Sequence, residues 1–446
     1  MVPDSRSWPP ELKAIPGVIG FVEYLKTASA RSGEEVCLNE GKSEIPTLFE
    51  AAPAIEKRLF AIEAEVSALR EDLSRNLEEV GRFKILRLVV EDAVSAKEPS
   101  SHTFAMYTVP ADAFLQMTEV KMHEELADAG VLSEFDESLG KAMFVSHQWL
   151  SDTHPDPDFQ QLKVLQDALR NIVAGTSSIS QDVFSEIVYG RGRGPTPGDF
   201  ASGHLHIWYD YFSIPQSHDH RASQDRQTAI QSIPTYVARC EFFVVLCPAL
   251  KHRDQKRTLS HATWGERGWC RTERVARELS TRGRRYVIIV ESATHQTLLW
   301  AGVNMRDAPG EGEFTLDGDR VLIGRMVTQM VWSKLFYYLE HRQFHNYRFL
   351  LNAQAAKYFR SLDVEPIDSL VPGFHTETDP SVDCKRFMLE RFLHQNGLRS
   401  VEAQDADSML VLDWCRQEHL RAGCCRVAAH LLCSDEQQRR CAGSAS

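Results

Sequence analysis

The chain has 446 residues, of which 43% are hydrophobic and 25% are charged, a composition typical of soluble globular proteins with two or three domains. Its formal net charge of -12 disfavours nucleic acid as a general partner, because phosphate binding depends on Lys and Arg side chains. No apolar run reaches the roughly 18 residues that a membrane helix needs, and no apolar core of a signal peptide opens the sequence, so we expect a cytoplasmic protein without a membrane segment.

The N-terminal region is predicted to hold a tail and a helix suited to self-association. Residues 1–50 contain Pro, Gly and mixed charge without clear periodicity, which predicts a partly disordered tail. Residues 51–84 have apolar side chains at alternating four- and three-residue spacing, as in a coiled-coil seam. These are Ile55, Leu59, Ile62, Val66, Leu69, Leu73 and Val80, with Asn76 at the remaining seam position. The 55–80 helix thus predicts a homo-oligomer, and a helix packed on its own domain fits the pattern equally well.

Residues 85–137 are predicted to form a helical linker region. A Lys-Glu-Pro-Ser-Ser segment is followed by the stretch from Ala111 to Gly130, whose apolar residues indicate one helix. Gly130 is a suitable stop for that helix, because glycine readily adopts the conformation found after a helix end.

Strands and helices alternate from residue 138 to residue 348. The predicted strands are Met143–Ser146, Leu205–Asp210, Phe242–Leu246 and Tyr286–Val290, and the predicted helices are Gln160–Val173, Ser223–Val237, Gly268–Ser280 and Gly324–Arg342. Short apolar runs separated by amphipathic helices need a parallel sheet that is buried on both faces. We therefore predict an α/β domain with a doubly wound, flavodoxin-like, five-stranded parallel sheet, and a helical C-terminal region at 349–446.

One motif in this domain carries a family resemblance. The sequence Trp269-Cys-Arg-Thr-Glu273 opens a helix after an apolar strand, and it resembles the signature of Toll/interleukin receptor (TIR) domains. Other passages agree with TIR domains in order and spacing, namely Met143–Leu150, Ile207–Tyr211 and Ala229–Ser232 followed by Phe242–Leu246. The loop Ser213–His220 departs from the charged, Gly-containing loop that TIR domains commonly have. Its surroundings also resemble the fungal heterokaryon-incompatibility domain, so we expect a divergent TIR-like branch.

The resemblance implies an intracellular signalling protein that hydrolyses NAD to nicotinamide and ADP-ribose upon self-association. NAD-cleaving TIR domains use the glutamate that Glu273 matches, so Glu273 is the candidate catalytic residue. A carboxylate beside the ribose stabilises the positive charge that develops during cleavage. Ligands of open parallel sheets bind beyond the carboxyl ends of the strands. The candidate ligand-binding residues there are Ser146, His147, Asp210, Trp264, Trp269, Arg267 and Arg271.

Other functions remain open. A non-catalytic interaction module would present the same loops to other TIR-like or repeat-containing proteins. From spacing alone, Glu273 could instead form an exposed ion pair with Arg277. A hydrolase using Cys247 or Cys270 with His147 is a further alternative, although nothing orients such a pair and buried, reduced thiols are favoured. No metal is expected, because the histidines between 204 and 220 lack the spacing of known metal sites.

Two further features of the sequence are a basic segment and a segment that resembles a repeat unit. Between Lys251 and Arg285, 11 Lys and Arg stand against 4 Asp and Glu, a local charge of +7 that indicates either a solvated surface or a phosphate site. Met409–Leu432, with Ala422-Gly423 between two helical patterns, resembles a degenerate ankyrin unit. A single repeat cannot bury its own core and has to dock on another surface.

Overall fold

The computed structural model describes residues 66–67, 103–191, 194–283, 285–302, 307–368, 370–371, 373–398 and 400. The chain divides into two compact units, residues 1–76 and 77–446. Val66 and Ser67 are the described residues of the first unit, and both are helical and exposed. The predicted tail, nearly all of the predicted coiled coil and the ankyrin-like unit therefore lie outside the described residues.

The second unit is built on a mixed β-sheet, which has eight strands among the described residues, in the order β2-β1-β5-β3-β6-β9-β10-β4. They are β1 (Tyr107–Pro110), β2 (Ser133–Glu134), β3 (Lys141–His147), β4 (Ile179–Gln181), β5 (Leu205–Tyr209), β6 (Phe242–Leu246), β9 (Tyr286–Val290) and β10 (Gln296–Trp300). The four central strands β5, β3, β6 and β9 are parallel, and antiparallel β1 and β10 flank them. A separate hairpin pairs β7 (Leu250–Lys251) with β8 (Thr258–Leu259).

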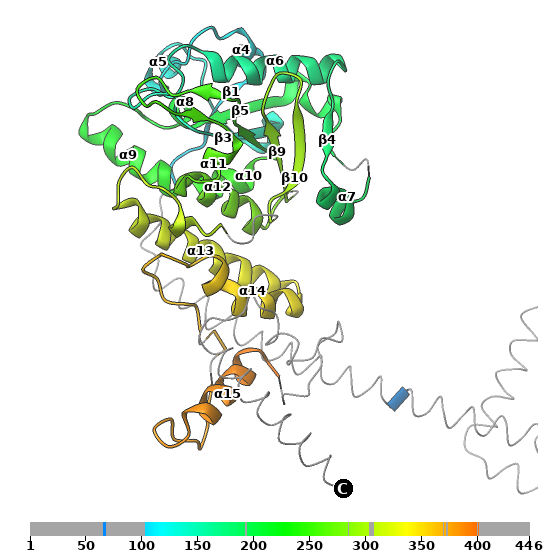
Figure 1. The fold of residues 1–446 in the computed structure, drawn as a ribbon, viewed down its shortest axis with the longest axis vertical. Helices are drawn as coiled ribbons and strands as arrows, with labels where there is room; N and C mark the ends of the chain where they lie inside the picture. The colour runs from blue at the N-terminus through cyan, green and yellow to red at the C-terminus, as the bar shows by residue number, and fades with distance from the viewer. Residues whose placement is uncertain are drawn as a thin grey trace, which may run out of the picture. The chain divides into compact units, whose positions relative to one another are not determined.

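Helices cover both faces of this sheet. They are α4 (Ala111–Gln116), α5 (His123–Asp128), α6 (Gln160–Ala174), α7 (Val183–Tyr189), α8 (Asp210–Ser213), α9 (His220–Gln231), α10 (Ile233–Arg239), α11 (His261–Trp264), α12 (Gly268–Leu279), α13 (Asp319–Glu340), α14 (Phe344–Lys357) and α15 (Cys384–Gln395). Figure 1 shows α4 and α6 on one side of the sheet and α10 and α12 on the other, with α13 and α14 beyond α12. Within the described residues, no helix is long and apolar enough to cross a bilayer.

The predicted α/β class with a mostly parallel sheet is confirmed, whereas a five-stranded flavodoxin-like sheet is not. The four strands predicted from apolar runs are the central strands β3, β5, β6 and β9. The sheet also reaches into the region predicted as a helical linker, because Val109 of β1 pairs with Ile207 of β5. The domain boundary predicted at residue 138 is therefore too late. A four-residue strand that ends in Pro110 has too few residues to show an alternating pattern.

Two predicted helices are each divided in the structure. The single helix expected between Ala111 and Gly130 consists of α4 and α5, with extended backbone at Met117 after α4. The helix expected over Ser223–Val237 consists of α9 and α10, which meet at Ser232. Pro234 lies in the first turn of α10 and has no N–H group, so it favours a helix start at this point.

The core has two layers because strand residues alternate between the faces of the sheet. The ring of Phe144 stacks on Trp208 and Phe243, with ring centroids 4.2 and 5.3 Å away, on the face covered by α10 and α12. The next residue, Val145, belongs to the core on the opposite face, which α4 and α6 cover. Burial of one such aromatic side chain stabilises the fold by about 2–3 kcal/mol.

Helix α12 is fixed at its start by a close backbone approach. The N–H of Gly268 donates to the carbonyl of Glu313 at 2.9 Å. A Cβ atom on Gly268 would lie 2.1 Å from the ring of Phe314, so a larger residue would displace that ring. The segment around residue 313 therefore determines where α12 begins.

The other end of α12 is fixed by a buried carboxylate. Glu278 accepts hydrogen bonds from Lys357 and from the hydroxyl of Tyr358, which lies 2.9 Å away, and it is 3.5 Å from Arg274. Lys357 ends α14 and Tyr358 follows it directly. Helix α12 is thus joined to α14 by a charged group that lies away from solvent.

Candidate functional site

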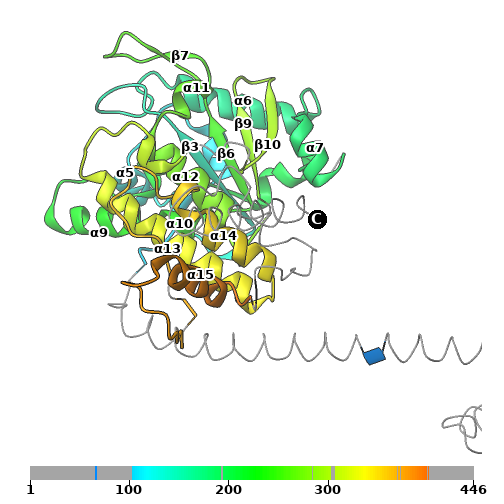
Figure 2. The same cartoon turned by 60° about the horizontal axis from the view of Figure 1, so that its bottom comes forward.

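The predicted site residues that follow the central strands meet at the carboxyl edge of the sheet. Ser146 and His147 end β3, and Asp210 comes directly after β5. Helix α12 follows β6 through the β7–β8 hairpin and α11, and it places Glu273 in its second turn at the same edge. Figure 2 shows the hairpin projecting beyond α11. Four of the predicted residues are thus collected by the strand order, as expected for an open parallel sheet.

On the α12 side of the sheet, three side chains form a chain of hydrogen bonds. The indole N–H of Trp264 donates to Oγ of Ser146 at 2.9 Å, and the hydroxyl of Ser146 donates to Oε2 of Glu273 at 2.5 Å. Trp264 and Ser146 are buried, whereas Glu273 is half-buried. The carboxyl of Glu273 is therefore held on one oxygen within a largely enclosed setting.

This environment alters the acidity of Glu273. Burial raises the pKa of Glu273 to about 8, the hydrogen bond from Ser146 opposes the change, and the nearby carboxylate of Asp210 adds to it. A carboxyl with this pKa is mostly protonated at neutral pH, and in its ionised form it is a stronger base than an ordinary glutamate.

A second group lies on the other face of β3. Nε2 of His147 is 2.8 Å from Oδ1 of Asp210, and the His147 ring stacks on Tyr209 with centroids 4.0 Å apart. Asp210 also accepts hydrogen bonds from the indole N–H of Trp149 at 3.0 Å and the backbone N–H of Tyr211 at 2.6 Å. His147 is almost completely buried, while one third of the Asp210 side chain is exposed.

The pKa values of His147 and Asp210 favour an ion pair. Burial alone would lower the pKa of His147, but the carboxylate of Asp210 outweighs it and the pKa is raised. Burial alone would raise the pKa of Asp210, but His147 and the hydrogen-bond donors outweigh it and the pKa is lowered. Each residue therefore stabilises the charged form of the other.

The remaining predicted ligand residues are engaged elsewhere. Each donates to an oxygen near the start of α12 or on a neighbouring segment: Trp269 to Asp319 at 2.8 Å, Arg267 to Thr315 at 2.9 Å, and Arg271 to the carbonyls of Gly265 and Ala308 at 2.6 and 3.2 Å. Trp264 is only 2% exposed, so neither of its faces is open for a nicotinamide or adenine ring. Trp264 is therefore not available as a ligand-binding residue.

Sequence reasoning missed two residues that directly follow β3. Trp149 binds Asp210, as described above. Gln148 accepts from the hydroxyl of Thr263 at 2.8 Å and donates to the Thr263 carbonyl at 3.1 Å, which joins the end of β3 to α11. The position of both residues at a strand end was the available signal, since it had already singled out Ser146 and His147.

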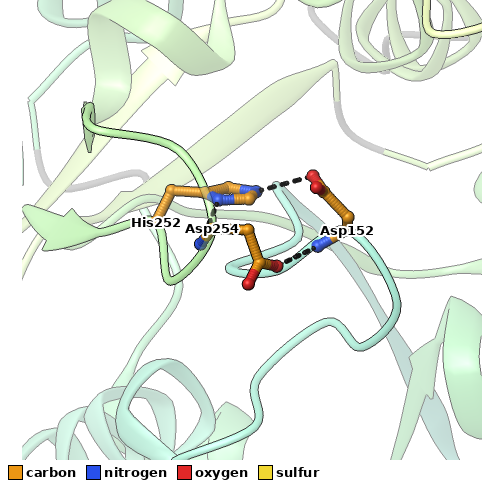
Figure 3. Close-up of side chains that lie close together, drawn as sticks. All are labelled: Asp152, His252 and Asp254. Atoms are coloured by element: carbon orange, nitrogen blue, oxygen red, sulfur yellow. Dashed lines mark hydrogen bonds and ion pairs between the residues drawn. The ribbon is translucent and has the colours of Figure 1, made fainter.

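Asp152, His252 and Asp254 form a cluster between the loops after β3 and β6, with potential ligand atoms within 4.8 Å of one another. Figure 3 shows His252 pointing toward Asp152, and Asp254 bonded to the backbone of Asp152. Nδ1 of His252 accepts two backbone N–H bonds, from Asp254 at 3.2 Å and Gln255 at 3.0 Å. Its proton therefore lies on Nε2, which faces Asp152 at 3.7 Å. The cluster joins the two loops by hydrogen bonds. Neither imidazole nitrogen of His252 has a free lone pair for a metal, because Nδ1 accepts hydrogen bonds and Nε2 carries the proton.

The cysteine alternative meets a similar difficulty. Sγ of Cys270 lies 3.7 Å from the backbone carbonyl of His147 and not against its ring. Burial raises the pKa of Cys270 well above that of an ordinary thiol, and burial also raises the pKa of Cys247. Both residues are therefore poor sources of a reactive thiolate.

Much of the basic segment between 251 and 285 serves the fold. Arg277 is fully buried and donates to the carbonyls of Cys240, Glu241 and Tyr286 at 2.7 to 3.2 Å. This position is incompatible with the exposed Glu273–Arg277 ion pair considered from the sequence. Arg253, Arg257 and Arg282 form ion pairs with Asp158, Glu313 and Glu137. A dedicated phosphate site therefore finds little support in this part of the described chain.

The loop from Ser213 to His220 is fixed by two side chains. Oε1 of Glu124 accepts from the backbone N–H groups of Gln216 and Ser217, at 2.8 and 2.7 Å. The guanidinium of Arg226 donates to the carbonyls of Pro215, Gln216 and Ser217 at 2.6 to 2.8 Å. These bonds give the loop a defined shape.

Comparison with protein-family models, with curated proteins and with solved structures finds no match to this chain. The candidate site is therefore interpreted from its own geometry.

Proposed function

We propose that the second unit contains a TIR-like domain that hydrolyses NAD to nicotinamide and ADP-ribose, with Glu273 as the catalytic residue. The observation that carries this proposal is the half-buried carboxyl of Glu273 at the carboxyl edge of the parallel strands, with a pKa raised to about 8. Along the sheet, the four central strands follow the chain order second, first, third, fourth, which is the beginning of a flavodoxin-like order. This order supports the finer fold assignment, which forms part of the proposal.

Cleavage of the bond between ribose and nicotinamide requires one well-placed carboxylate from the protein. When the bond between ribose C1′ and the nicotinamide nitrogen breaks, its electron pair neutralises the cationic ring, so the leaving group needs no proton. Positive charge develops on the ribose, and the carboxylate of Glu273 stabilises it. Water then adds to C1′ and gives its proton to Glu273, whose pKa suits a general base near neutral pH.

Asp210 is the second polar group that a ligand can reach in this arrangement. One third of its side chain is exposed, and His147 keeps its carboxylate ionised. We assign to it a hydrogen bond from a ribose hydroxyl. His147 is almost completely buried and acts through Asp210 rather than on the ligand.

The test is nicotinamide release from NAD by the full chain, measured at concentrations high enough for self-association. Glu273→Gln preserves the side-chain shape and removes the carboxylate, so release should fall by about 100-fold or more. Glu266→Gln is the matched control, because Glu266 is exposed on the segment leading into α12. Equal release by the wild type and Glu273→Gln, or no release by any variant, would contradict the proposal.

Self-association is part of the proposed activity. A coiled coil at residues 55–80 would raise the local concentration of the domains and couple assembly to catalysis. Light scattering on the fragment 53–83 tests this step, since a strictly monomeric fragment removes the proposed route to oligomers. The proposed setting is the cytoplasm.

A second candidate function is a non-catalytic interaction module, and one surface favours it. Val183, Phe184 and Ile187 of α7 are 69%, 63% and 74% exposed, beside the edge strand β4 (Figure 1). Exposed apolar side chains that lie together often mark a protein interface. If this is the main function, Phe184→Ser with Ile187→Ser will weaken association in sedimentation experiments, and the wild type will release no nicotinamide.

A further inference from the structure

The hydrogen bonds around Glu273 have a defined direction when its carboxyl is ionised. An indole N–H can only donate, so Oγ of Ser146 accepts from Trp264. Ser146 has a single hydroxyl proton, and Oε2 of Glu273 lies 2.5 Å away. In the ionised form of Glu273 the carboxylate can only accept, so in that form this proton points from Ser146 to Oε2. Trp264 thereby turns the Ser146 hydroxyl toward Glu273.

The two oxygens of Glu273 consequently differ. Oε2 is bound by a buried serine, which a buried tryptophan orients. Oε1 accepts no hydrogen bond from the described residues, and it is not among their enclosed, unpartnered atoms. Oε1 is thus the oxygen that keeps contact with solvent.

We infer that Trp264 and Ser146 are positioning residues for Glu273: they hold Oε2 and present Oε1 to the ribose of the substrate. This inference rests on the proposed function for the identity of the ligand, while the hydrogen bonds themselves do not depend on it. The role replaces the ligand-binding role that the sequence suggested for Trp264.

A positioning role has a signature that a merely structural role lacks. The Ser146 hydroxyl bonds to the ionised carboxylate and therefore favours ionisation of Glu273. Ser146→Ala should raise the midpoint of the pH profile of nicotinamide release by about one pH unit and lower its plateau about 10-fold. Trp264→Phe should raise the midpoint by a smaller amount, about half a unit. A purely structural loss would reduce the plateau and leave the midpoint in place.

Two controls and one rescue define the comparison. Trp269→Phe removes an indole bond to Asp319, on a residue that is not part of the chain to Glu273, and should not move the midpoint. Ser213→Ala removes an equally buried hydroxyl, which accepts from the backbone of Tyr209, and should not move it either. Ser146→Thr keeps the hydroxyl and should restore the midpoint toward that of the wild type.

A second measurement does not require activity. The free energy of unfolding of the full chain is determined by urea denaturation between pH 5 and pH 10. Ionisation of Glu273 lowers the free energy of unfolding over a certain pH range, and Ser146→Ala should shift that range upward by about one pH unit. In a Glu273→Gln background, the same serine change should leave the pH dependence unaltered.

The outcomes separate the inference from the proposed function. An upward shift of the stability window without any nicotinamide release supports the positioning role and rejects the NAD reaction. If the protein releases nicotinamide but Ser146→Ala shifts neither the midpoint of the activity profile nor the pH dependence of the free energy of unfolding, the positioning role is overturned. The NAD reaction itself is then still supported. If Trp264→Phe fails to fold, Ser146→Ala alone decides between these results.

Discussion

Glu273 and Asp210 are carboxylates at the same edge of the sheet, and their pKa values are shifted in opposite directions. Burial dominates at Glu273, where a single hydroxyl stabilises the charge, and the pKa rises to about 8. At Asp210 the cationic ring of His147 and two N–H donors outweigh burial, and the pKa is lowered. Titratable groups whose pKa values are shifted in opposite directions commonly have different roles in one site.

The shift at Glu273 has a testable effect on stability. Its pKa in the folded protein, about 8, exceeds that of an unfolded glutamate, so the folded state binds the proton more tightly. Its contribution to stability is present below about pH 4.5 and is lost as pH rises through about 8. We expect the free energy of unfolding to fall by about 1–3 kcal/mol between pH 5 and pH 9, allowing for partial solvent screening. Urea denaturation should show a smaller fall in Glu273→Gln, and an identical fall would contradict the shift.

The pair of His147 and Asp210 predicts a different pH dependence. The folded pKa of His147 is raised above 6.5, so its contribution is complete below that pH and is lost as pH rises through the folded value. Asp210→Asn removes the partner of the cation and should destabilise the protein by about 1–3 kcal/mol more at pH 6 than at pH 9. Denaturation midpoints at the two pH values measure this difference. Asp128→Asn, at an exposed position on α5, serves as the control.

At the scale of secondary-structure elements, α12 connects the two ends of the sheet. Glu273 lies at the carboxyl edge, while Arg277 on the same helix binds backbone carbonyls near the amino ends of β6 and β9. The sequence predicted the bounds of α12 closely, because an amphipathic pattern follows a clear loop. It could not reveal that Arg277 lies inside, since a cation at this spacing is typical of an exposed face.

Loss of the buried guanidinium should be costly. Arg277→Ala leaves three carbonyl oxygens without this donor and creates a cavity, so we expect a loss of about 2–4 kcal/mol in the free energy of unfolding. Arg282→Ala breaks an exposed ion pair with Glu137 and should cost less than about 1 kcal/mol. Urea denaturation of the two variants gives the comparison, and similar losses would argue against the buried role of Arg277.

The accuracy of the sequence predictions differed between central and peripheral elements. Strands such as β3 and β6 are buried on both faces, so they appear as continuous apolar runs. The edge strand β4 has three residues and no such run, and β1 is nearly as short. At the site, the strand-end rule selected Ser146, His147 and Asp210, but the partners of Trp264 and Trp269 depend on loop geometry that spacing does not encode.

At the scale of the whole molecule, the structure changes the expected limits of the folded core. Residues 103–137, predicted as linker, supply two strands, and Tyr236 of α10 donates to the carbonyl of Phe104 at 2.8 Å. Limited proteolysis of the full chain should therefore yield a stable fragment that retains this segment. Mass spectrometry identifies the fragment ends. Cleavage near residue 138 without loss of stability would show that β1 and β2 contribute little to the fold.

The bonds of Glu278 give α12 a mechanical role. Glu278 lies five positions after Glu273 on the same helix, and it accepts hydrogen bonds from Lys357 and Tyr358 at the end of α14. A movement of α14 therefore either breaks these bonds or moves α12, the helix that carries Glu273. A displacement of α14 that keeps these bonds would therefore shift Glu273 without any contact with the substrate.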